Sequence, residues 1–135
     1  MKVEIYPNNK NFIDNYIDFN GDTLFPMTKD YILRDECYTD DDWIKWVKYS
    51  MDDGTPLALI GERLLGEEPD SRHISVYEVN KDYRGLGLGT QVFQDYLQAN
   101  DKWTLYSMPE NANFYKVLGF SLSTNEGYKN FYRRG

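Results

Sequence analysis

A glycine-rich turn between an apolar strand and an amphipathic helix constrains this chain most strongly. Residues 76–99 read VYEVNKDYRGLGLGTQVFQDYLQA, with glycine at the alternate positions 85, 87 and 89. Glycine permits positive φ angles and close approach of another backbone. A strand that continues through such a turn into a helix leaves unpaired N–H groups at the positive end of the helix dipole, where phosphate oxygens bind. The alternative is an ordinary turn that begins a helix.

The turn does not fit two common phosphate-binding motifs. The dinucleotide motif G-x-G-x-x-G needs a third glycine where this chain has Thr90, and the Walker motif needs a Gly-Lys-Ser/Thr sequence that the chain lacks. The turn fits R-x-x-G-x-G instead, from Arg84 to Gly89, five residues after Val79. This arrangement resembles the acyl-CoA signature of the GNAT superfamily of N-acyltransferases.

A second segment supports the same resemblance. Residues 114–120, FYKVLGF, are similar to the F-Y-x-x-x-G-F segment of that superfamily. One predicted helix and one predicted strand separate the two segments, as in the superfamily. The order and spacing together are more specific than either segment alone.

Periodicity predicts the remaining elements. Residues 40–51 fit a helix, because a T-x-x-D capping pattern at 39–42 precedes apolar residues at helical spacing. The rival interpretation is a strand that ends in a hairpin turn at Asp53-Gly54. Residues 29–38 fit either a helix or a packed loop. The other predicted helices are 11–19, 90–99 and about 107–118, and the predicted strands are 2–6, 56–62 with 63–66 as its hairpin partner, 72–79, 102–106, 120–123 and 129–133.

This order of elements predicts an α/β (α+β) fold in one domain over residues 1–135, with a central mixed sheet of six to seven strands and helices on both faces. The same order is found in the GNAT superfamily. The resemblance further implies a splay between the fourth and fifth strands, where 72–79 and 102–106 diverge at their carboxyl ends.

Composition excludes several classes of protein. The net charge of −7 and pI near 4.6 argue against nucleic-acid binding and favour a cationic partner. One cysteine and one histidine exclude an internal disulfide and make a Cys/His metal site implausible. The chain has no apolar run long enough for a membrane span and no apolar N-terminal leader, so we expect a cytoplasmic protein without metal.

The resemblance implies how acetyl-CoA would be held as co-substrate. Divergence of the two strands would free the backbone of Tyr77 and Val79 to bond the pantetheine arm. A free N–H at Val79 could polarise the thioester carbonyl, an effect worth on the order of 3 kcal/mol. Arg84 could instead cap a surface turn, and Asn111 could serve only the helix start. The residues implied to hold the pyrophosphate and pantetheine groups are Arg84, Gly85, Leu86, Gly87, Leu88, Gly89, Thr90, Asn111 and Asn113.

Two side chains are candidates for proton transfer. The resemblance places the general acid at Tyr115, whose phenol has an ordinary pKa near ~10 and could donate to a thiolate leaving group. Strand alternation places His73 on the same face as Tyr77 and Val79. His73 could act as base through intervening waters, about 20 Å from Val79 at roughly 3.3 Å per residue. The alternative for Tyr115 is a core tyrosine on an amphipathic helix, and the alternative for His73 is a structural histidine.

Three functions are open at this point. The first is an N-acetyltransferase that moves an acetyl group from acetyl-CoA to a primary amine by direct attack in a ternary complex. The second is a non-catalytic acyl-CoA-binding sensor or interaction module of the same fold. The third is an α/β interaction protein without a ligand. The acceptor amine is not specified by the sequence, and the superfamily's frequent dimers leave a homodimer open.

Overall fold

Seven strands form one sheet in the computed structural model, which describes residues 1–7, 25–26, 43–63, 70–126 and 129–135. The strand order across the sheet is β1-β2-β3-β4-β5-β7-β6. Every neighbouring pair is antiparallel except β4 and β5, which are parallel. The strands are β1 Lys2–Pro7, β2 Trp43–Ser50, β3 Pro56–Arg63, β4 Arg72–Val79, β5 Trp103–Ser107, β6 Ser121–Glu126 and β7 Lys129–Arg134.

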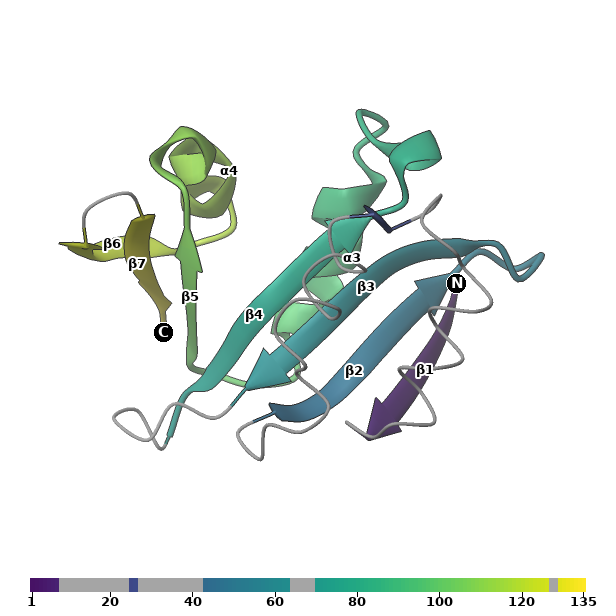
Figure 1. Cartoon of the computed structure of the whole chain (residues 1–135), viewed down its shortest axis with the longest axis horizontal. Helices are drawn as coiled ribbons and strands as arrows, with labels where there is room; N and C mark the ends of the chain where they lie inside the picture. Colours follow the sequence, from purple (N-terminus) through teal and green to yellow (C-terminus); the bar gives the residue numbers. More distant parts are fainter. Residues whose placement is uncertain (8–24, 27–42, 64–69, 127–128) are drawn as a thin grey trace.

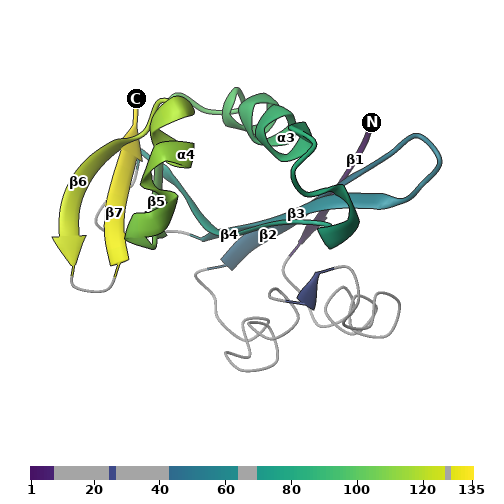
Figure 2. The same cartoon turned by 90° about the horizontal axis from the view of Figure 1, so that it is seen from above.

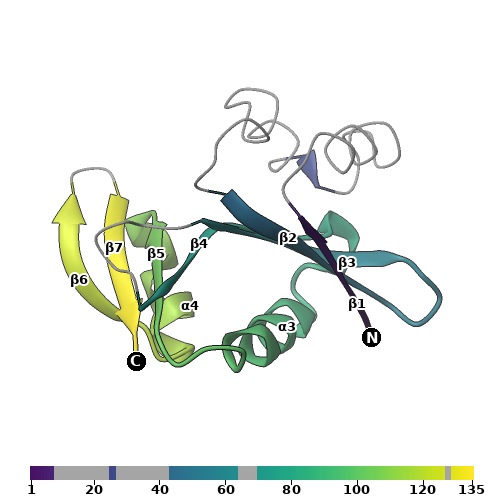
Figure 3. The same ribbon diagram turned by 90° about the horizontal axis from the view of Figure 1, so that it is seen from below.

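Two α-helices connect the second half of the sheet. Helix α3, Leu88–Leu97, follows β4, and helix α4, Ala112–Val117, follows β5. The short 3-10 turns η2, Lys81–Tyr83, and η3, Pro109–Asn111, precede them. Both helices lie on the same face of the sheet (Figures 2 and 3). The predicted helix at 11–19 and the ambiguous segment 29–38 lie outside the described residues.

The predicted α/β fold class with a central mixed sheet is confirmed, while both described helices lie on one face, so helices on the second face stay a prediction. The sheet is mixed, and its fourth and fifth strands separate at one end (Figure 1). All the strands predicted outside 63–66 form, with small shifts at their ends. The predicted hairpin partner 63–66 is wrong at its first residue, because Arg63 ends β3, and β3 pairs with β2 and β4 instead.

The helix predicted for 40–51 is wrong over residues 43–50, which form β2, and the hairpin turn at Asp53-Gly54 is confirmed. Both faces of β2 are covered, since the adjacent residues Trp46 and Val47 are both fully buried. A strand buried on both faces carries consecutive apolar residues, and these gave the appearance of helical spacing.

The hydrophobic core lies between the sheet and the two helices. Its helical side comes from α3, whose apolar stripe holds Val92, Phe93, Tyr96 and Leu97. The sheet contributes side chains that alternate toward the helices, among them Val47, Tyr49, Ile60, Ile74, Leu105 and Tyr132.

A buried ion pair joins β3 to β4 beside this core. The Glu62 carboxylate is fully buried and accepts from Arg72 Nε at 2.7 Å and from the Arg72 Nη2 atom at 2.5 Å. The Arg72 guanidinium also lies 4.6 Å from the ring of Trp103. Lys45 Nζ is a weaker neighbour of the same carboxylate, at 3.7 Å. No helix among the described residues is long and apolar enough to span a membrane.

We predict that Arg72→Met lowers the free energy of unfolding by about 3 kcal/mol, because it leaves a buried carboxylate without its bidentate partner. Urea denaturation measures the change. Lys45→Met is the matched control and should cost less than about 1 kcal/mol, since Arg72 would still satisfy both carboxylate oxygens. Equal losses in the two variants would contradict this assignment.

Candidate functional site

The candidate site lies where β4 and β5 stop pairing and their backbones separate, and we call this separation the slot. The two strands pair only from Arg72–Trp103 to Ile74–Leu105. Beyond this point β4 continues to Val79 and β5 to Ser107, and the strands diverge (Figure 1). The parallel ladder is therefore three residue pairs long, and the slot lies above its last pair.

The backbone of β4 faces this slot at two predicted positions. Residues in an antiparallel pair alternate between hydrogen-bonded and non-hydrogen-bonded positions. Asn80 N–H donates to the Leu57 carbonyl at 2.7 Å, and the register continues through Glu78 opposite Leu59. Tyr77 and Val79 are consequently at non-bonded positions, so their N–H and C=O groups point away from β3 and into the slot.

The glycine turn closes one end of the slot. Gly85 and Gly87 have φ angles of +81° and +79°, which side-chain-bearing residues rarely adopt. Gly87 caps α3, and the first helical hydrogen bond runs from Gln91 N–H to the Gly87 carbonyl at 3.2 Å. The N–H groups of Leu88, Gly89 and Thr90 therefore have no acceptor within the helix. They are suited to bind an anion.

Gly89 allows α3 to approach β4 closely. A Cβ atom at this position would lie 2.8 Å from Val79 Cγ2 and 3.4 Å from the Tyr77 hydroxyl. The Tyr77 hydroxyl donates to the Gly89 carbonyl, and the Tyr77 ring stacks on Phe93 of α3 with centroids 4.5 Å apart. The third glycine of the motif thus serves packing between the helix start and the strand end.

A cleft of about 310 Å³ lies at this junction. It joins the end of β4 to the helix start, and α4 contributes one ring to its wall. Its lining residues are Tyr77, Val79, Tyr83, Arg84, Gly85, Gly87, Gly89, Thr90 and Phe114. Most of the predicted cofactor-binding positions are therefore together, and Leu86, which is largely exposed, lies beside them in the turn.

Arg84 is bound to the end of β4. Its Nε donates to the Val79 carbonyl at 3.0 Å, and Nη2 lies 3.2 Å from the Glu78 carboxylate, which is buried. The side chain remains half exposed. In this structure Arg84 ties the glycine turn to the strand, as a turn-capping residue would.

Tyr115 lies between the two halves of the sheet on the helix side. Its ring centroid is 6.1 Å from that of Phe93 and 5.9 Å from that of Tyr132. Burial raises the pKa of the Tyr115 phenol, and a hydrogen bond with Ser107 acts in the opposite direction. The phenol is consequently protonated at neutral pH, as a proton donor must be.

The two predicted asparagines lie in different surroundings. Asn111 Nδ2 donates to Ser107 Oγ at 3.3 Å, so it is linked through Ser107 to the Tyr115 phenol. Asn113 is exposed on α4. The structure therefore brings Asn111, but not Asn113, to the end of β5 through the Ser107 side chain.

His73 is not on the face predicted for it. Val76 pairs with Gly61 and Ile74 with Glu62, so Ser75 is an extra residue that forms a β-bulge. The bulge reverses the alternation, and Tyr77 stacks on α3 while His73 packs against Tyr106 and Phe131 on the opposite face. The expectation that His73 shares a face with Tyr77 and Val79 is wrong for this reason.

His73 is buried at the closed end of the slot. Its Nδ1 lies 2.8 Å from Thr104 Oγ1 across the β4–β5 pair. Burial, with the charges of Arg63 and Lys129 nearby, lowers the pKa of His73 to about 4. The imidazole is neutral at pH 7, but its position favours a structural role.

Three residues near Tyr115 were not found from the sequence, namely Ser107, Asn130 and Tyr132. Ser107 contacts both Asn111 and Tyr115, and Asn130 lies directly opposite it on β7. Asn130 is buried and donates to the Tyr132 hydroxyl at 3.3 Å. Only the pairing of β5 with β7 brings these residues together, and no local sequence signal encodes that pairing.

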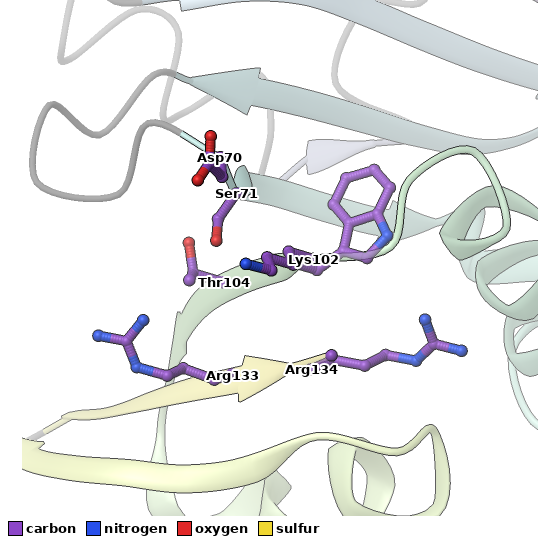
Figure 4. Close-up of a pocket in the computed structure, with 8 residues that line it drawn as sticks. Asp70, Ser71, Lys102, Thr104, Arg133 and Arg134 are labelled. Carbon is purple, nitrogen blue, oxygen red and sulfur yellow. The ribbon is translucent and has the colours of Figure 1, made fainter.

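A second, polar cavity of about 190 Å³ lies at the other end of β4 and β5. Asp70, Lys102 and Arg133 line it, together with Arg134. The guanidinium groups of Arg133 and Arg134 extend in opposite directions along β7 (Figure 4). Arg133 Nε donates to Ser123 Oγ, and Arg134 Nε donates to the Leu118 carbonyl, each at 3.0 Å. Each guanidinium therefore holds a neighbouring segment of the chain, and the two do not point at a common ligand position.

No cluster of three or more His, Cys, Asp or Glu side chains that could hold a metal ion occurs within the described ranges.

One comparison with known proteins identifies a family. A family model described as the acetyltransferase (GNAT) domain matches residues 55–133. No curated protein sequence matches the chain.

Solved structures share the fold at low sequence identity. The PaiA N-acetyltransferase of Thermoplasma acidophilum, in complex with coenzyme A, is 14% identical with a TM-score of 0.63, over 99% of both chains. Tetrahymena GCN5 is 14% identical with a TM-score of 0.65, over 99% of this chain and 95% of that one. A variant of the spermidine N-acetyltransferase SpeG of Vibrio cholerae is 12% identical with a TM-score of 0.61, over 98% and 92%.

We predict that Gly89→Ala lowers the free energy of unfolding by about 1–3 kcal/mol, because the added methyl group overlaps Val79. Thermal or urea denaturation measures the loss. Combining it with Val79→Ala removes the overlapping Cγ2 atom, so the double variant should lose less than the sum of the two single variants. Strict additivity would show that the close contact does not limit the position of α3.

The burial of His73 predicts a pH-dependent part of the stability. The histidine binds a proton near pH 6.5 when unfolded but only near pH 4 when folded. The contribution of the neutral, buried His73 to the free energy of unfolding is therefore complete above pH 6.5. This contribution decreases as the pH falls toward 4, and the loss reaches about 2 kcal/mol at pH 5.

Urea denaturation of the wild type and of His73→Gln at pH 7 and pH 5 tests this. The difference between the two proteins isolates the histidine from the carboxylates that also titrate. The difference in the free energy of unfolding between the wild type and His73→Gln should shrink or reverse at pH 5. The same difference at both pH values would contradict the burial of an uncharged imidazole.

Proposed function

Because this chain belongs to the acetyltransferase (GNAT) family, we propose that it transfers an acetyl group from acetyl-CoA to a primary amine. The observation that carries the proposal is the slot between β4 and β5, which opens beside the start of α3, where the N–H groups of Leu88, Gly89 and Thr90 have no acceptor within the helix. A pyrophosphate and a thioester arm of one molecule would need these two features at neighbouring positions.

The residues of the turn would hold the phosphate end. The N–H groups of Leu88, Gly89 and Thr90 point out of the first turn of α3, and the positive φ angles of Gly85 and Gly87 shape the loop before it. The resemblance assigns Leu86 and Arg84 to the same group. Arg84 would act mainly by fixing the loop, since Glu78 and Val79 already hold its guanidinium.

The strand backbone would hold the pantetheine arm. Tyr77 and Val79 direct their peptide groups into the slot, and a Val79 N–H aimed at a thioester carbonyl would stabilise developing negative charge. Across the slot, Asn111 reaches the end of β5 through Ser107, so it is better placed than Asn113 to contact the arm.

Tyr115 would hold the proton that the leaving thiolate takes. Ser107 contacts its phenol oxygen, and the rings of Phe93 and Tyr132 pack beside the Tyr115 ring. For the base we favour a water over His73, because His73 is buried on the other face of the sheet. Direct attack in a ternary complex needs no covalent enzyme intermediate.

The acceptor would be cationic before it reacts. The chain carries a net charge of −7, which attracts amines from solution. The spermidine acetyltransferase among the similar structures is one protein of this fold with such a substrate. The homodimer and the cytoplasmic location inferred from the sequence stay predictions.

A non-catalytic acyl-CoA-binding module is the second candidate. The observation that favours it is the burial of Tyr115, because a raised pKa makes the phenol a weaker proton donor. Such a module would keep the glycine turn and the slot without needing the acid.

We predict that Tyr115→Phe lowers kcat by about 10²–10⁴-fold, the usual contribution of a general acid, and leaves CoA affinity within about threefold of wild type. Turnover on a panel of primary amines and calorimetry with CoA provide the two measurements. Binding without turnover in the wild type would support the second candidate. The absence of heat at high micromolar CoA would reject both.

A further inference from the structure

The strand β1 forms one edge of the sheet (Figure 1). It pairs with β2, and no other strand of the described residues pairs with its outer side. The outward N–H and C=O groups of an edge strand can pair with another chain, and many proteins prevent this with a bulge or a proline. The register of β1 with β2 has no bulge, and its proline, Pro7, is the last residue of the strand. The beginning of β1 therefore lacks these two devices.

Apolar side chains of this edge are exposed on the helix face of the sheet. Val3 pairs with Tyr49 and Ile5 with Val47, and both partners belong to the core under the helices. Residues directly opposite each other in a sheet share a face, so Val3 and Ile5 lie on the helix face too. Met1, Val3 and Ile5 are nevertheless 50%, 49% and 64% exposed. These three residues are called the edge stripe below.

Charged side chains alternate with the edge stripe on the opposite face. Glu4 lies across from Lys48 of β2, and its carboxylate is 3.8 Å from Lys48 Nζ. The same Nζ atom lies 5.9 Å from the centroid of the Tyr6 ring. Lys2, Glu4 and Tyr6 therefore share this face, and Lys2 and Glu4 are exposed. The edge thus carries one cation and one anion two residues apart.

We propose that β1 pairs antiparallel with β1 of a second copy of this chain, about a two-fold axis that passes through the sheet at Val3. Such an axis reverses the strand direction and keeps the two faces of the sheet, so the two sheets continue into one. Val3 then lies opposite Val3 of the second copy, and Met1 lies opposite Ile5. The edge stripes of the two copies cover each other on the helix face. The pairing does not depend on the proposed acetyl transfer.

Charge favours this register over its neighbours. On the other face, the axis at Val3 places Lys2 opposite Glu4 of the second copy, and the symmetry makes this pair twice. An axis at Glu4 would place the two Glu4 carboxylates opposite each other, and like charges in that position destabilise a sheet. An axis at Ile5 would place Glu4 opposite Tyr6, and Pro7, which has no N–H to donate, opposite Val3. The chain is therefore self-complementary in the register centred at Val3.

Charge reversal tests the pairing by analytical ultracentrifugation over a series of protein concentrations. Lys2→Glu and Glu4→Lys should each weaken the dimer by about 5- to 50-fold, because each places two pairs of like charges across the axis. The two variants change the net charge in opposite directions, so a general effect of charge would move the dissociation constant in opposite directions. The double variant Lys2→Glu/Glu4→Lys exchanges the charges and should bind within about threefold of wild type.

Three outcomes of this measurement would overturn the proposal. One is a wild type that stays monomeric at every concentration. The second is a dimer that both single variants leave unchanged. The third is opposite effects of the two single variants, with no recovery in the double variant.

Cross-linking tests the position of the axis. Cys37→Ser removes the one cysteine of the chain, and Val3→Cys in this background should form a disulfide between two copies on oxidation, because the axis brings this residue against itself. Ile5→Cys should cross-link less, since Ile5 meets Met1. Leu122→Cys is the matched control, because Leu122 is similarly exposed but lies on β6, at the other edge of the sheet. Equal yields at positions 3 and 122, or a higher yield at position 5 than at position 3, would contradict the axis at Val3.

Discussion

The early end of the β4–β5 ladder determines the rest of this structure. Peptide groups in a sheet normally find partners on both sides, and groups left without them are costly when they are buried. Here β4 and β5 part after Ile74 and Leu105 although both strands continue. The bulge at Ser75 follows the last pair immediately, and β5 continues to pair with β7. Beyond the last pair, β4 thus stays paired with β3 and β5 with β7, whereas β4 and β5 no longer pair with each other.

The two faces of the sheet differ in their polar groups at this opening. On the helix side, the glycine turn presents peptide N–H groups and the start of a helix dipole, which suit an anion. On the other side, the ammonium of Lys129 lies over the ring of Tyr106. In an acidic chain with a pI near 4.6, an anion bound at this turn would be held by backbone N–H groups and would not depend on basic side chains.

Sequence reasoning succeeded where local chemistry decides the structure and failed where distant pairing does. The glycine turn, the strand before it and the helix after it were predictable because their signals are adjacent in the chain. Residues 43–50 were misread because burial of both faces removes the alternation of a typical strand. The face of His73 was misassigned because the bulge at Ser75 has no marker in the sequence. The contacts of Ser107 with Asn111 and of Tyr106 with Phe131 required knowledge of which strands are neighbours.

The short parallel ladder also has a mechanical meaning. Among the residues that the structure describes, three pairs between β4 and β5 join the half-sheet β1–β4 to the half-sheet β5–β7, from Arg72 to Ile74 on the β4 side. An extended molecule that bonded to both walls of the slot would prolong this ladder with its own amides, in the manner of an inserted strand. Hydrogen bonds through the bound molecule would then connect the two half-sheets beyond the three existing pairs. The protein would consequently be most rigid while the molecule is bound.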